Sequence, residues 1–179
     1  MARTVLGIIA SPKDADKAVE ELKKAGFSSD DISVIVKEEA KMAAVEETRG
    51  GKIAKDAASG AATGGAIGGI AGLIIGIAAI AIPGIGGIIA AGPLSIALGL
   101  TGVGTTTLAG AITGAAAGGL IGGLVGIGVP RKHAEIYEEA IKKGQVLLAV
   151  STTDENEKQA TEIFEKHGAA QVCSIASKE

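Results

Sequence analysis

The chain has very few aromatic residues: no tryptophan, one tyrosine and two phenylalanines among 179 residues. It therefore has almost nothing from which to build the stacking surfaces that bind bases or sugars. Its 17 basic and 20 acidic side chains leave a net charge of −3, so a strongly basic surface is excluded as well. A single cysteine, Cys173, excludes a disulfide bond within the chain. We expect no nucleic-acid partner.

The amino terminus lacks the pattern of a secretory signal. Its apolar run, "VLGIIA", is about six residues long, shorter than the usual hydrophobic stretch of a signal peptide. We therefore expect a chain that is made and kept in the cytoplasm, or inserted into the cytoplasmic membrane from that side.

Charge is absent from one long part of the chain. Residues 57–130 contain no Asp, Glu, Lys, Arg, His, Asn or Gln, and they hold 22 of the 28 glycines. We call these residues the charge-free block. All formally charged side chains lie on either side of it, so the two parts require separate interpretations.

The part before the block predicts a strand, a helix and a second strand. "TVLGIIAS" is a short apolar run that is typical of a buried strand, and "DISVIVK" is a second one. Between them, Ser11 can cap a helix, Pro12 suits its first turn and Gly26 ends it.

The part after the block predicts the same order behind one extra helix. That helix covers 131–143, after Pro130, and "QVLLAVST" follows as a strand. A second helix is expected to be capped by Thr153 or Asp154 and to end at Gly168, and "AQVCSIAS" is the last strand. A shift of 142 residues places the first strand, helix and glycine over the later ones as a faint repeat.

Two such units predict an α+β fold of the ferredoxin-like type, with four antiparallel strands and the helices on one face. The predicted domains are residues 1–50 together with 130–179, which form the α/β domain, and residues 51–129, which form an inserted apolar helical hairpin.

Glycine recurs at every fourth position in two stretches of the block. Such spacing places the glycines in one stripe along a helix, where they let another helix approach closely. Each glycine costs a helix about 1 kcal/mol relative to alanine, so we expect the stripes to serve helix packing. The predicted packing residues are Gly60, Gly64, Gly68, Gly72, Gly76, Gly110, Gly114, Gly118, Gly122 and Gly126.

The stripes predict two helices, from about Lys52 to Ala81 and from about Thr105 to Gly128, each long enough to cross a bilayer of about 30 Å. Their bulky faces are expected to meet lipid or another apolar layer. The connecting turn is assigned to Pro83, Gly84 and Pro93, with residues 84–104 as a tip or re-entrant piece. Basic residues flank the block on both sides, which favours both ends in the cytoplasm, although the aromatic belt of membrane proteins is missing.

The layout resembles the bacterial general stress protein 17M-like family of heat-induced stress proteins. The resemblance rests on "VLGIIASPKDADKAVEELKKAGFSSDDISVIVKEE", on "IPGIGGIIAAGPL" and on "AAAGGLIGGLVGIGVPRKHAEIYEEAIKKGQVLLAV". It implies a stress-associated protein with a membrane connection, and it implies no reaction and no catalytic residues.

No pattern in the sequence indicates an enzyme. "GVGTTT" lacks the lysine of a phosphate-binding loop, and "GGAIGG" lacks the strand before it and the acidic residue after it that a dinucleotide site needs. His133 and His167 are expected on solvated helix ends or faces rather than as metal ligands. We expect no cofactor, no metal and no identifiable small-molecule substrate.

Three functional hypotheses follow. The first is a structural membrane protein that self-associates through its glycine-striped helices, with the α/β domain in the cytoplasm. The second is a soluble, cytoplasmic subunit of a cage, ring or filament, in which the glycine helices are buried between copies. In the third, the α/β domain senses a ligand and the block anchors it.

Overall fold

The computed structural model describes residues 2–39, 70, 73, 80–82, 84–99 and 113–176. Their centre is one antiparallel sheet of six strands, in the order β3-β4-β2-β5-β1-β6. The strands are β1 (Ala2–Ile9), β2 (Ile32–Lys37), β3 (Ile80–Ile82), β4 (Gly86–Ala91), β5 (Val146–Thr153) and β6 (Ala170–Ala176). The α+β class predicted from the sequence is confirmed.

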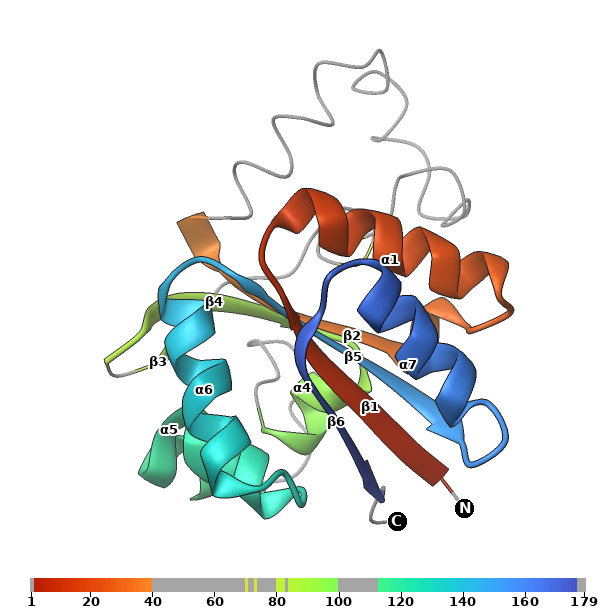
Figure 1. Cartoon of the computed structure of the whole chain (residues 1–179). Coiled ribbons are helices and arrows are strands. Elements are labelled where there is room, and N and C mark those ends of the chain that lie inside the picture. The colour runs from red at the N-terminus through yellow and green to blue at the C-terminus, as the bar shows by residue number, and fades with distance from the viewer. Residues whose placement is uncertain are drawn as a thin grey trace, which may run out of the picture.

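Helices cover both faces of this sheet (Figure 1). One face carries α1 (Pro12–Lys24) and α7 (Glu157–Lys166), and the other carries α4 (Pro93–Ala97), α5 (Thr113–Gly126) and α6 (Arg131–Lys142). A short 3-10 helix, Ser29–Asp31, precedes β2. The prediction of helices on one face only is wrong, because the charge-free block supplies α4 and α5 to the second face.

The strands explain why two helical layers are needed. In β1, Val5 and Ile9 belong to the core on the α1–α7 side, while Leu6 and Ile8 belong to the core on the other side. Successive side chains of a strand point to opposite faces, so a strand that is apolar throughout must be covered twice. Its glycine serves the same packing, because a Cβ at Gly7 would lie only 2.8 Å from Cδ1 of Phe164.

Local signals place the helices of the outer part. The Oγ of Ser11 accepts a hydrogen bond from the backbone N–H of Asp14 at 3.2 Å, and Pro12 begins α1 as predicted. Helix α6 also lies where it was predicted, and its Ala134, Tyr137 and Ile141 are buried. The predicted cap of the last helix is wrong by two residues or more: the N-cap of α7 is Asn156, and its side chain makes no capping hydrogen bond.

The sheet gains two strands from the charge-free block. The first glycine-striped helix was predicted to run to Ala81, but Ile80–Ile82 is a strand that pairs with β4. β4 in turn pairs with β2, where Val34 lies opposite Ala91. The physical reason lies in β2, which is buried on both faces and has β5 on only one side. Its other side would leave backbone N–H and C=O groups unpaired without β4.

A buried hydrogen bond joins β4 and α4 to β2. Gly92 has a positive φ of +87°, and a Cβ there would meet the carbonyl oxygen of Ile32 and lie 2.7 Å from the Cα of Ser33. The backbone N–H of Leu94 donates to the Oγ of Ser33 at 3.0 Å. Only glycine fits this crossing, so the middle of the block is built into the α/β core rather than projecting from it as a tip.

The second glycine-striped helix is shorter than predicted. Instead of a helix from about Thr105 to Gly128, the described residues contain α5, which starts at Thr113 and is interrupted at Gly119 (φ 65°, ψ −164°). Leu120 and Leu124 of α5 are fully buried in the core beside α6, so this apolar face does meet another apolar layer. Among the described residues, no helix has the length and apolarity needed to cross a membrane.

Candidate functional site

Most residues of the predicted packing stripes cannot be placed. Gly60, Gly64, Gly68, Gly72, Gly76 and Gly110 lie outside the described residues, and so does Pro83 of the predicted turn. The role assigned to them stays a prediction, as does the division into domains at residues 51 and 129.

The other stripe glycines lie in α5: Gly114, Gly118, Gly122 and Gly126. Gly126 is exposed, and a Cβ placed on it would find no heavy atom of the described chain within 4 Å. At this position the described residues therefore provide no closely approaching helix, and the bare surface is open for one.

Gly84 and Pro93 flank β4. Gly84 has a φ of +85° in the turn between β3 and β4, and the backbone N–H of Ile85 donates to the carbonyl oxygen of Ile82 at 3.1 Å. Pro93 begins α4. Both residues thus mark changes of direction, but the turn at Gly84 joins two strands and not two helices.

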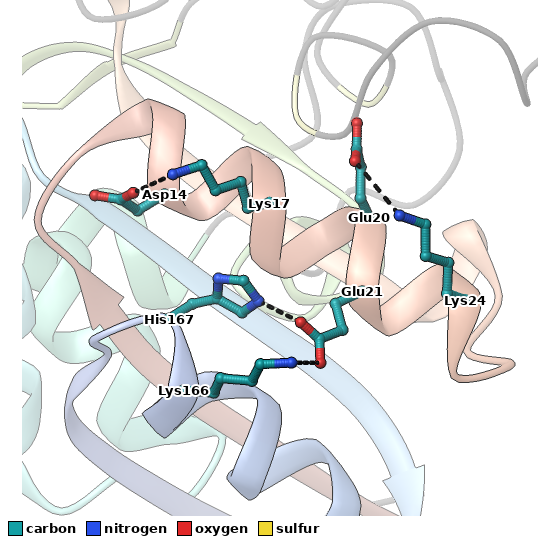
Figure 2. Close-up of polar contacts among 7 residues, drawn as sticks. All are labelled: Asp14, Lys17, Glu20, Glu21, Lys24, Lys166 and His167. Carbon is teal, nitrogen blue, oxygen red and sulfur yellow. Dashed lines mark hydrogen bonds and ion pairs between the residues drawn. The ribbon is translucent and has the colours of Figure 1, made fainter.

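The described residues gather one polar cluster that links the two helices of one face. Glu21 of α1 contacts Lys166 and His167 at the end of α7 (Figure 2). The Nζ of Lys166 lies 2.6 Å from Oε1 of Glu21, and the Nε2 of His167 lies 2.7 Å from Oε2. We call these three residues the α1–α7 cluster. The side chain of His167 is only 15% exposed, so it is more enclosed than the solvated position predicted for it.

The charge of Glu21 is favoured by its partners. Hydrogen bonds from Lys166 and then from His167 lower the pKa of the Glu21 carboxyl, and burial opposes them more weakly. The carboxylate is thus held ionised between two helix ends. Basic groups at the carboxyl end of a helix also suit the helix dipole.

A groove of about 410 Å³ lies beside the cluster, between α1 and α7. Charged, amide and apolar side chains line it together: Glu21, Lys24, Ala25, Gln159, Glu162, Ile163 and Lys166. It is open, and its lining mixes both signs of charge, which favours no ligand class. No group of three or more His, Cys, Asp or Glu that could hold a metal occurs within the described part of the chain.

On the other face, Tyr137 anchors the edge of the sheet. Its hydroxyl donates to the carbonyl oxygen of Gln171 at 2.6 Å, and Gln171 has a φ of +54° where β6 shifts register against β1. Burial is the first cause that raises the pKa of Tyr137, and proximity to Cys173 adds to it. Burial also raises the pKa of Cys173. Both groups therefore keep their protons at neutral pH, and neither is poised as a nucleophile.

The sequence did not reveal the α1–α7 cluster. Glu21 was one charge in a charge-rich helix, and His167 was placed on a solvated helix end. One signal was present, because the repeat at a shift of 142 residues aligns the end of α1 with the end of α7. In a fold built from two similar units, such ends can come together.

These features define a class: a small α+β protein with a fully covered antiparallel sheet, whose polar clusters link helices rather than form a recognisable catalytic set. Residues 4–81 match the family described as the heat induced stress protein YflT domain. This match confirms the resemblance to the heat-induced stress proteins over those residues. No curated protein and no solved structure matches the chain.

Proposed function

We propose that this is a non-enzymatic, stress-associated structural protein that self-associates through its charge-free block. The observation that carries the proposal is how the block is divided. Residues 80–99 and 113–129 contribute strands and helices to the α/β core, whereas residues 57–79 add a further 23 residues without a charge or an amide side chain. A segment of this composition needs an apolar partner, because large exposed apolar patches are rare on soluble monomers.

We also infer that the four strands outside the block form a ferredoxin-like unit that β3 and β4 extend. Its support is the order β2-β5-β1-β6 with antiparallel neighbours, which two interleaved βαβ units would produce. In this interpretation the unit is the rigid body that carries the self-associating segment.

The test is the particle size of the full chain purified without detergent. We expect an oligomer in size-exclusion chromatography with light scattering. The double variant Gly68→Leu with Gly118→Leu should reduce it to smaller species, because a bulky side chain separates helices that pack through glycine. The matched control is Gly68→Ala with Gly118→Ala, which adds only one methyl group at each site and should retain more of the oligomer. A monomeric wild-type chain would overturn the proposal.

Membrane association is the second candidate, and one observation favours it. The uncharged stretch 57–79 has the length of a membrane-spanning helix, about 20 residues, and Lys52 and Lys55 precede it. Flotation of the purified chain with anionic phospholipid vesicles tests this candidate. A chain that floats only with vesicles and stays bound in high salt supports it, and a chain that remains at the bottom of the gradient excludes it.

A further inference from the structure

Helix α1 contacts a residue of the charge-free block that is far away in the sequence. The backbone N–H of Ile70 donates to Oδ1 of Asp16 at 2.7 Å, across 54 positions of the chain. Ile70 is 2% exposed and belongs to the hydrophobic core on the α1–α7 side of the sheet. Leu73, one helical turn later, packs against the same core.

The place that receives Ile70 recognises two features at once. Ala15 and Val19 of α1 and Ile89 of β4 belong to the same core cluster as the Ile70 side chain. The carboxylate of Asp16 accepts its backbone N–H. A buried N–H needs an acceptor, and a charged acceptor makes a stronger hydrogen bond than a neutral one. The contact is therefore specific for a backbone that approaches α1 here with an apolar side chain.

We propose that the Asp16–Ile70 contact is a holding contact that keeps this part of the charge-free block docked on the α/β core and thereby limits self-association. The inference rests on the proposed function. When docked, the side chains of Ile70 and Leu73 are covered by their own chain. When released, they expose apolar surface that a second copy of the chain can bury.

The energetics make the contact adjustable. A hydrogen bond to a charged group is worth about 1.5–3 kcal/mol, which corresponds to roughly 10- to 100-fold in the docking equilibrium. Only the released fraction can associate, so the apparent association constant should rise with that fraction. Loss of the acceptor at Asp16 should thus loosen the segment while the sheet and its two cores stay folded.

The experiment compares Asp16→Ala with wild type by hydrogen exchange and by light scattering over a dilution series. We expect the backbone amide of Ile70 to exchange roughly 10- to 100-fold faster in Asp16→Ala, with a stronger tendency to oligomerise. The matched control is Glu20→Ala, one turn further along α1, because Glu20 pairs with Lys24 instead. Asp16→Asn keeps an acceptor oxygen without the charge, and we expect it to lie between wild type and Asp16→Ala.

The outcomes separate this inference from the proposed function. Equal exchange at Ile70 in Asp16→Ala and Glu20→Ala would overturn the holding contact, whether or not the chain oligomerises. Faster exchange with an unchanged association constant, in a chain that does oligomerise, would overturn the link between release and association. A wild-type chain that is monomeric at every concentration would overturn the proposed function, while the exchange data would still decide whether Asp16 holds Ile70. Asp16→Asn keeps the test valid should Asp16→Ala fail to fold.

Discussion

The two faces of the sheet are covered by helices of different chemistry, although they bury similar side chains. Phe164 and Leu22 are fully buried beneath α7 and α1, and Leu120 and Leu124 are equally buried beneath α5. The outer sides differ. Helices α1 and α7 carry many charged residues, whereas the sequence of α5, "TGAAAGGLIGGLVG", contains none. Burial of the inner face therefore does not require a charged outer face.

The difference shows what each face is prepared to meet. The charged helices are finished for water, and ion pairs such as Lys166–Glu21 link one to the other. Helix α5 shows Val125, 42% exposed, and an open position at Gly126. A surface of this kind gains free energy from an apolar partner. The comparison thus supports the proposal that the charge-free block carries the self-association.

The largest expected effect compares the cores of the two faces. Phe164→Ala should lower the free energy of unfolding by about 3–5 kcal/mol and Leu124→Ala by about 2–5 kcal/mol, because each leaves a cavity among fully buried neighbours. Chemical denaturation with urea measures both. Val125→Ala is the control on α5, and its expected effect is only about 0.5 kcal/mol because its side chain is partly exposed. Equal losses for Leu124→Ala and Val125→Ala would mean that α5 is not part of the core.

The next effect tests how the block is joined to the sheet. Gly92→Ala should cost about 2–5 kcal/mol, because a positive φ is strained for alanine and the new Cβ meets the backbone of β2. Gly144→Ala is the control: its φ is also positive, +84°, but its Cβ would meet nothing within 4 Å. Its cost should be about 1–2 kcal/mol, from the backbone conformation alone. The same thermal or urea denaturation of both variants decides, and equal costs would contradict the close crossing at Gly92.

A smaller effect is expected at the sheet edge. Tyr137→Phe removes the hydroxyl that donates to the carbonyl oxygen of Gln171 and should cost about 1–3 kcal/mol, because that carbonyl loses its partner. Amide exchange in β6 should rise together with the loss of stability. Unchanged exchange in β6 would mean that the hydroxyl does not hold the bulged strand.

The smallest effect concerns the charged face and depends on pH. The pKa of Glu21 is lowered in the folded chain, so the folded state binds this proton less well than the unfolded state, where the pKa is about 4.3. The stabilisation is therefore complete above that value and is lost as the pH falls through the lower, folded pKa. Stability measured between pH 7 and pH 3 should fall less in Glu21→Gln than in wild type.

Glu165→Gln, an exposed carboxylate on α7, is the matched control for that measurement, and it should follow the wild-type curve closely. Parallel pH curves for wild type and Glu21→Gln would mean that the α1–α7 cluster contributes no stability.

The outer elements could be predicted because their signals are local. Ser11, Pro12 and Gly26 bound α1, and one buried face per helix fixes the period of α6. β3 and β4 could not be predicted in the same way. Residues 80–91 are uniformly apolar, so they have no periodicity that separates a strand from a buried helix. The available signal was indirect: β2 is apolar on both faces, and a strand of this kind needs a neighbour on each side.

The candidate site was predicted less well than the fold. Regular glycine spacing indicates close helix packing but not the partner, and the first stripe lies outside the described residues. The contacts Glu21–His167 and Asp16–Ile70 join residues far apart in the sequence. Neither belongs to a motif, so only the tertiary arrangement brings them together.

The most direct test of the central claim is the mass of the full chain in solution without detergent, measured by light scattering. The claim predicts an oligomer that the pair Gly68→Leu and Gly118→Leu reduces to smaller species and that the matching alanine pair largely retains. A wild-type chain that stays monomeric at all concentrations, or an oligomer that the leucine pair leaves unchanged, would contradict it.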